Sequence, residues 1–179
     1  MSKIGKINIS IPEKVKIAVN GNIVNVEGPL GKKSLNVDLD NFDLNIKEGK
    51  EVSIKPKKVN DDIKRLWGMN RSLLNNAIIG TSTGYTKTLE LVGVGYRAAI
   101  KGKQLNLQLG FSHDINFNIP ENIKILVEKQ TIIKISGIDK QLVGMISSKI
   151  KSFRPPEPYK GKGIKEKGQY ILRKEGKKK

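Results

Sequence analysis

The segment "TIIKISGIDKQLVGMISSKIKSF", from Thr131 to Phe153, changes its hydrophobic period within a few residues. Apolar and polar side chains alternate over 131–135, which predicts a β-strand with one buried face. An apolar stripe at helical spacing then follows, which predicts an amphipathic helix with Asp139 as its N-cap. The members of this stripe are Leu142, Met145, Ile146, Ile150 and Phe153.

The first half of the chain follows the same plan. The segment "DDIKRLWGMNRSLLNNAI" predicts a second amphipathic helix over 61–78, with Asp61 as its N-cap. Because Trp67 and the helix methionines stand at core spacing, we expect them to pack in the interior. A Gly-Met pair recurs in the two helices about 75–80 residues apart, which indicates an internal duplication. The stripe of this helix consists of Ile63, Leu66, Trp67, Leu73, Leu74 and Ala77.

Short segments of alternating hydrophobicity precede each helix and predict strands. They span 20–28, 35–39, 42–46 and 51–55 in the first half, and 101–109, 115–119, 123–127 and 131–135 in the second. This order favours the α+β class, with two tandem duplicated domains that each pack a small antiparallel or mixed β-sheet against one helix. The segment "GTSTG", rich in turn-forming residues, predicts the junction between the two domains. A basic extended tail is expected at the C-terminus. The expected boundaries are 1–81, 82–154 and, for the tail, 155–179.

The composition indicates a polyanionic partner. The 179 residues carry a formal net charge of +17, and twelve basic and three acidic side chains in 149–179 supply +9 of it. Such an excess favours nucleic acid first and an anionic membrane surface second. A membrane partner would also need lipidation or an apolar insertion face, so we expect none. The absence of cysteine excludes disulfides, thiolate catalysis and cysteine-bound zinc.

The sequence contains no apolar run of about 20 residues that would predict a membrane span. Its start, "MSKIGKINISIP", alternates apolar and polar residues instead of presenting the apolar core of a signal peptide. We therefore expect a cytoplasmic protein.

Two motifs match parts of enzyme active sites. The segment "GVGYRA", 93–98, fits a dinucleotide fingerprint, but a strand pattern follows where that fingerprint needs a helix. Glycines at a bend or a close backbone contact explain it better. The segment "SHD", 112–114, sets triad residue types side by side, although neighbours on an extended chain point to opposite faces. We expect no enzyme activity, catalytic residue, cofactor, metal site or small-molecule substrate.

The segment "SFRPPEPYKGKG", from Ser152 to Gly163, combines prolines, glycines and lysines. The proline after Arg154 disfavours helical geometry, so we expect the second helix to end there. The prolines then predict a stiff, extended path of polyproline type. Glycines allow a close backbone approach and the lysines supply charge, which suits a phosphate-lined surface. A PxxP ligand for an SH3-type groove is the second interpretation of 155–158.

Among nucleic acids, folded RNA recognised by shape and backbone fits best. Aromatic residues make up 5% of the chain, whereas single-strand binders of the stacking type use aromatic platforms. Neither predicted helix is strongly basic along one face, as a DNA recognition helix would be. The alternative is a nonspecific nucleic-acid-binding architectural protein, and a solvated basic tail without a partner is a third possibility.

Several motifs together resemble the bacterial ribosomal protein L6 family of the large subunit. They are "SKIGK" and "IP" near the start, "VEGPLG" at 26–31, "GYTKTLELVGVGYRA" at 84–98, "LGFSHDINFNIP" at 109–120 and "RPPEPYKGKGI" at 154–164. The resemblance covers nearly the whole chain. Two positions depart from it, because Glu166 stands where the family usually has an aromatic residue and Asp114 stands where a proline is common.

The resemblance implies a non-enzymatic structural constituent of the large ribosomal subunit. It implies binding to 23S rRNA, mainly through the C-terminal domain and tail, near the stalk base and the factor-binding region. Neighbouring large-subunit ribosomal proteins are the other expected partners, and the cytoplasm is the expected location.

The matched C-terminal motif also implies particular rRNA contacts. The first-choice residues are Arg154, Tyr159, Lys160, Gly161, Lys162 and Gly163. Charge alone adds Lys165, Arg173, Lys174, Lys177, Lys178 and Lys179. Secondary candidates are Arg97 and His113, whereas Lys3 and Lys6 are assigned to the packing of an N-terminal arm.

Overall fold

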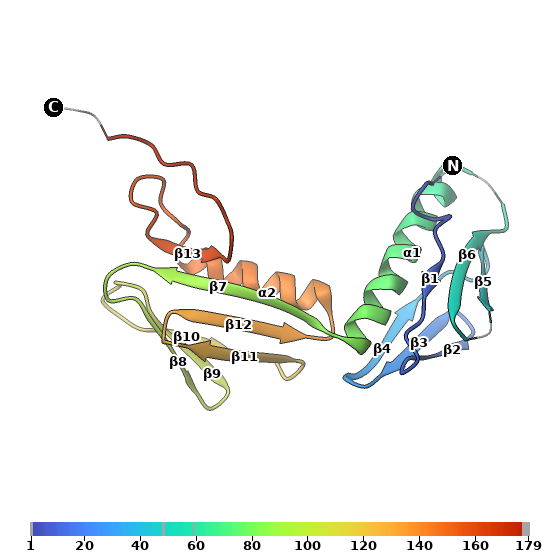
Figure 1. Ribbon diagram of the computed structural model, residues 1–179, viewed down its shortest axis with the longest axis horizontal. Helices are drawn as coiled ribbons and strands as arrows, with labels where there is room; N and C mark the ends of the chain where they lie inside the picture. Colours follow the sequence, from blue (N-terminus) through green and yellow to red (C-terminus); the bar gives the residue numbers. More distant parts are fainter. Residues whose placement is uncertain (1, 48, 59, 177–179) are drawn as a thin grey trace. The chain divides into compact units, whose positions relative to one another are not determined.

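The chain forms two α+β units, which are shown in Figure 1. The computed structural model describes residues 2–47, 49–58 and 60–176. The chain divides into Met1–Gly84 and Tyr85–Lys179, here called unit 1 and unit 2. Each unit combines small β-sheets with one long helix, which confirms the predicted α+β class and its repeated plan. In the described residues each unit has two sheets, and their strand pairs are antiparallel.

Unit 1 packs helix α1 (Asp61–Ser82) against two three-stranded sheets. The first sheet has the strand order β1 (Ile9–Ser10), β6 (Glu51–Pro56), β5 (Phe42–Lys47). The second has the order β2 (Lys16–Asn20), β3 (Ile23–Gly28), β4 (Gly31–Asn36). Strand alternation turns Val24 and Val26 of β3 into the core, where they are fully buried. Trp67 closes this core from α1, and its indole nitrogen donates a hydrogen bond of 2.6 Å to the Ile54 carbonyl.

Unit 2 packs helix α2 (Lys140–Phe153) against a four-stranded sheet. Leu89, Ile133 and Ile135 of this sheet are fully buried and share one hydrophobic core with Ile146 and Ile150 of α2. The strand order of this sheet is β11 (Ile123–Glu128), β12 (Ile132–Gly137), β7 (Tyr85–Val92), β13 (Gly163–Glu166). The second sheet has the order β10 (Ile115–Asn118), β9 (Gln104–Gln108), β8 (Arg97–Lys101).

The two helices begin differently. Asp139 caps α2 as predicted, because its carboxylate accepts a hydrogen bond of 3.0 Å from the Gln141 N–H. The prediction that Asp61 is the N-cap of α1 is wrong, since Asn60 holds that position and makes no capping bond with its side chain. Asp61 is the first helical residue and accepts a hydrogen bond of 2.6 Å from Lys64, which lowers the pKa of its carboxyl.

The prediction that the helix methionines pack in the interior is also wrong. Met69 and Met145 are 49% and 61% exposed. Each residue of an α-helix is turned by about 100° from the one before it, so Met145 points away from the core that Ile146 enters. Buried polar residues complete the inner faces instead, with Asn70 on α1 and Ser147 on α2.

Strand β13 joins the C-terminal segment to the edge of the unit 2 sheet. It pairs with β7 in antiparallel register, so that Ile164 lies opposite Leu91 and is fully buried. The sequence predicted an extended tail here, and four residues of that segment belong to the sheet. The strand carries a single apolar residue, so it has no hydrophobic period by which the sequence could reveal it.

Gly163 is the residue at which the chain enters β13, and its replacement by alanine tests that junction. Its φ is +139°, and an added Cβ would lie 2.6 Å from both the Pro155 carbonyl oxygen and the Pro156 Cα. Backbone strain and this overlap together lead us to expect Gly163→Ala to destabilise unit 2 by about 2–4 kcal/mol. Amide hydrogen exchange of the β7 and β13 residues, measured on the full chain, reports the loss.

Gly144→Ala is the matched control for this substitution. Gly144 lies within α2, and an added Cβ there meets nothing within 4 Å. Alanine has the higher helix propensity, so we expect a gain of up to about 1 kcal/mol. Equal hydrogen exchange in the two variants would show that Gly163 does not constrain this strand.

Candidate nucleic-acid interface

Helix α2 ends at Phe153, where the sequence predicted it to end. Arg154 leaves helical geometry with φ −149° and ψ 84°, because a proline follows it. The prediction of one stiff, extended path after this point is wrong. A turn at 158–160 reverses the chain, and the Glu157 N–H donates a hydrogen bond of 2.9 Å to the Lys162 carbonyl.

The loop 157–162 does not stand alone. After β13 the chain returns past it, and the Lys174 N–H donates a hydrogen bond of 2.8 Å to the Pro158 carbonyl (Figure 1). Gly161 also lies close to the Arg173 guanidinium, since a Cβ added at Gly161 would be 3.8 Å from one of its nitrogens. The loop and the segment 171–174 therefore lie side by side.

Five exposed side chains lie on this pair of segments, and we call them the C-terminal basic patch. They are Tyr159, Lys160, Lys162, Arg173 and Lys174. Within the part of the chain that the structure describes, none of the four cations forms an ion pair. Their charges are therefore available to an external anion. The predicted contacts Lys177, Lys178 and Lys179 lie outside the described residues.

The two glycines of the predicted contact set have a different position. Gly161 and Gly163 are buried, with φ of +71° and +139°. The loop needs these backbone conformations, which residues with a side chain rarely adopt. Both glycines therefore have a structural role in the loop, and their contact to RNA stays a prediction.

Lys165, another predicted contact, is half-buried and paired inside the fold. Its amine lies 3.2 Å from the carboxylate of Glu90 on the neighbouring strand β7. An ion pair of this kind lowers the charge that Lys165 can offer to a ligand. It also favours the observed register of β13, because the two residues face each other across the strand pair.

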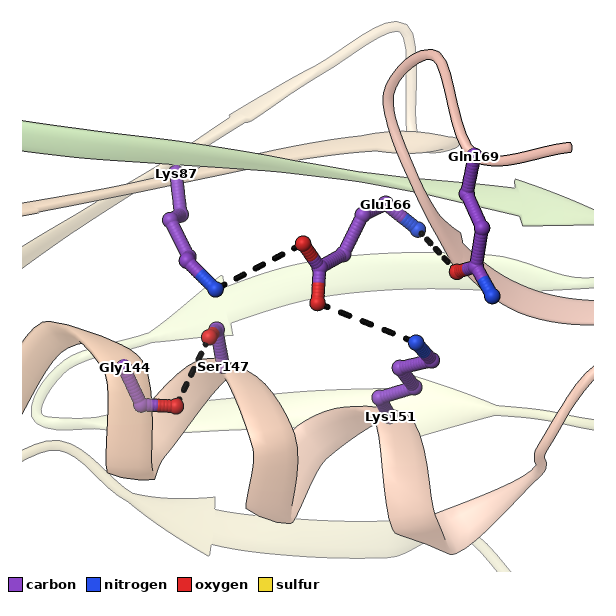
Figure 2. A network of polar contacts seen from close by, with 6 residues as sticks. All are labelled: Lys87, Gly144, Ser147, Lys151, Glu166 and Gln169. Carbon is purple, nitrogen blue, oxygen red and sulfur yellow. Dashed lines mark hydrogen bonds and ion pairs between the residues drawn. The ribbon is translucent and has the colours of Figure 1, made fainter.

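Glu166 forms a second charge network beside this pair, as Figure 2 shows. Its two carboxylate oxygens lie 3.5 Å from the Lys87 amine on β7 and 3.7 Å from the Lys151 amine on α2. The Glu166 N–H donates a hydrogen bond of 3.2 Å to the side-chain carbonyl of Gln169. Glu166 thus connects β13 to both layers of unit 2. Figure 2 also shows Ser147 on α2, whose hydroxyl donates to the Gly144 carbonyl.

Arg154 and His113, two of the predicted RNA contacts, both lie against Phe111, a residue that the sequence analysis did not single out. Arg154 lies with its guanidinium carbon 5.0 Å from the centre of the Phe111 ring. His113 stacks on the same phenylalanine, with ring centres 6.1 Å apart and planes inclined by 23°. An exposed phenylalanine in the "GFSH" turn was the available signal, and Phe111 is 40% exposed.

The remaining candidates occupy other places. Arg97 is exposed on strand β8. Lys3 and Lys6 have exposed side chains in the N-terminal segment of unit 1. The packing in that segment comes from Gly5, which lies so close to the Trp67 ring that an added Cβ would be 2.6 Å from it.

The structure assigns other roles to the motifs that match enzyme sites. Gly93 and Gly95 form the turn between β7 and β8, and the Tyr96 ring packs close to Gly93. A strand follows this turn, as predicted, so no helix N-terminus faces the glycines. The Asp114 carboxylate accepts hydrogen bonds from Asn106 at 3.3 Å and from Gln108 at 3.4 Å.

Within residues 2–47, 49–58 and 60–176, no group of three His, Cys, Asp or Glu side chains could hold a metal ion. No helix there is long and apolar enough to span a membrane.

Burial raises the pKa of Tyr85, which lies on β7 outside the C-terminal basic patch.

Comparison with known proteins gives matches along the whole chain. The family model "Ribosomal protein L6" matches residues 92–167, the segment from the end of β7 through β13. The large ribosomal subunit protein uL6 of Sphingopyxis alaskensis is 47% identical over 179 residues, and that of Parvibaculum lavamentivorans is 48% identical over 181. The uL6 protein of Paramagnetospirillum magneticum is 48% identical over 179 residues. Each alignment covers 100% of both chains, and the chain therefore belongs to the ribosomal protein L6 family.

Proposed function

We propose that the chain is a non-enzymatic structural protein of the large ribosomal subunit that binds 23S rRNA through its C-terminal basic patch. The observation that carries the proposal is a set of four cations that form no ion pair within the described residues. Two of them lie on a loop tied to a sheet edge, and two lie on the segment beside that loop. Membership in the ribosomal protein L6 family supports it, as do relatives named as large-subunit proteins.

The geometry suits a phosphate backbone. Lys160 and Lys162 lie on a loop closed by its own hydrogen bond, and Arg173 and Lys174 lie on the segment beside it. Because the loop is already ordered, less conformational entropy is lost when RNA docks. Lysine and arginine gain affinity for RNA by releasing the counterions that surround the phosphates.

The family resemblance supports a more specific site on the ribosome. We propose that the bound rRNA lies near the base of the stalk and the factor-binding region, with neighbouring large-subunit proteins as further contacts. The cytoplasm is the corresponding location. Arg154, Gly161, Gly163, Lys165, Lys177, Lys178, Lys179, Arg97 and His113 remain proposed contacts beyond the patch.

Substitution of the two loop lysines tests the patch. We expect Lys160→Ala with Lys162→Ala to weaken binding to 23S rRNA and to flatten its salt dependence. Each lost phosphate contact should reduce the slope of log affinity against log salt by roughly 0.7–0.9. A filter-binding titration over several salt concentrations measures this slope.

The matched control removes two positive charges elsewhere in unit 2. Lys101 on β8 and Lys124 on β11 are exposed strand residues, so Lys101→Ala with Lys124→Ala changes the net charge equally. We expect this variant to keep the slope of the unaltered chain. Equal slopes for both double variants would exclude the loop lysines as contacts.

Competition between RNAs separates specific rRNA binding from the alternative of a nonspecific architectural protein. The full chain and a chain ending at Gln169 are titrated with 23S rRNA, random RNA of equal length and duplex DNA. The shorter chain keeps β13 and the Gln169 bond but lacks Arg173, Lys174 and the last lysines. We expect 23S rRNA alone to remain bound at high salt, and the shorter chain to lose this advantage. Release of all three ligands at one salt concentration would favour the nonspecific protein.

A further inference from the structure

Unit 2 exposes a small stack of flat side chains that its core does not use. Phe111, His113 and Arg154 are all exposed. The histidine ring stacks on the phenylalanine, and the guanidinium lies over the same phenylalanine ring. The neighbouring Phe117 and Phe153 pack edge to face, and Phe117 is buried. Packing against the core therefore accounts for Phe117 and Phe153, whereas Phe111, His113 and Arg154 are open to solvent.

The turn that carries the stack is fixed from both ends. Gly110 precedes it with φ +74°, and an added Cβ there would lie 3.3 Å from the Tyr96 ring. Asp114 follows it, and its carboxylate is held by Asn106 and Gln108 of β9. The aromatic side chains therefore project from a turn that is anchored to the sheet, which lowers the entropic cost of binding a flat ligand.

Arg154 connects the stack to the C-terminal segment that carries the basic patch. The Arg154 carbonyl accepts a hydrogen bond of 2.8 Å from the Ile164 N–H of β13. The same arginine begins the segment that leads into the basic loop at 157–162. The stack therefore contains the residue from which the chain runs into the basic loop. A stacking surface and a cationic loop on one segment match the two parts of a nucleotide, its base and its phosphate.

We propose that Phe111, His113 and Arg154 form a stacking site for an unpaired nucleobase of the bound RNA. The proposal rests on the RNA-binding function above and names the RNA element, a base in a loop or bulge rather than a paired stem. Aromatic rings and guanidinium planes accept an unstacked base through its π face without reading its sequence. The cations of the loop that follows Arg154 along the chain would hold phosphates of the same RNA.

Replacing the phenylalanine tests the site in the full chain with 23S rRNA. We expect Phe111→Leu to weaken binding about 5- to 100-fold, because base stacking on an aromatic ring is lost while an apolar side chain remains. The salt slope should stay unchanged, since no phosphate contact is removed. We expect Phe111→Trp to retain the affinity, and its fluorescence, measured against the single native tryptophan, to be quenched by the RNA.

Chemical modification of unpaired bases gives a direct readout. The unaltered complex should protect one unpaired base, and the Phe111→Leu complex should leave that base reactive. Arg154→Lys keeps the positive charge but removes the planar guanidinium, so it should expose the same base. Hydrogen exchange of β13 checks that both variants remain folded, which the exposure of both residues favours.

The outcomes separate this site from the proposed function. If the full chain binds 23S rRNA but Phe111→Leu binds equally well with the same protected bases, the stacking site is refuted and RNA binding stands. An aromatic contact to a neighbouring protein would then be the remaining occupant. If the unaltered chain shows no preference for 23S rRNA, the proposed function fails, and the stacking site fails with it.

Discussion

The antiparallel pairing of β13 with β7 is the interaction on which the candidate interface of unit 2 depends. It buries Ile164 completely and returns the chain to the sheet after the proline-rich loop. Both ends of the loop are thereby fixed, one at helix α2 and the other at the sheet edge. Without this pairing, the segment after residue 154 would be a charged, freely moving chain that loses far more entropy on binding. The strand thus converts a basic tail into a shaped surface.

The basic residues near the C-terminus are of two kinds, those paired with a carboxylate and those without such a partner among the described residues. Lys165 on β13 is paired with Glu90, and Glu166 accepts Lys87 and Lys151 as partners. These partly exposed pairs each contribute up to about 1 kcal/mol, so their main effect is to reduce the charge that the paired lysines can offer to a ligand. The lysines of the loop have no such partner among the described residues. The pairing of Lys165 therefore leaves the exposed cations on the loop and on the segment beside it as the ones available to an external anion.

Glu166 stands where the family resemblance led us to expect an aromatic residue, and the structure gives this carboxylate a role of its own. An aromatic residue at this position would contribute by packing, whereas Glu166 contributes by bridging two lysines from different layers of unit 2. The sequence alone gave no role for the carboxylate at this position. The lysines concerned lie 79 and 15 positions away along the chain, so only the fold brings them to the carboxylate.

The sequence by itself determined the α+β class, the repeated plan, the Asp139 cap and the end of α2. These features follow from local periods, capping and the restriction before proline, all of which act over a few residues. It also identified the lysines and the arginine of the C-terminal basic patch, because charge is visible in composition.

Only the tertiary structure decided which of the basic residues of the C-terminal segment keep a charge that an external anion can reach. Strand β13 could not be predicted, since one apolar residue gives no period and its stability comes from β7. Long-range packing also decided that Met69 and Met145 face solvent and that Gly161 and Gly163 are buried. The stack of Phe111, His113 and Arg154 joins residues about 40 positions apart, a distance that no local pattern can cross. The sequence gives the chemistry of each side chain, but the fold determines which side chains come into contact.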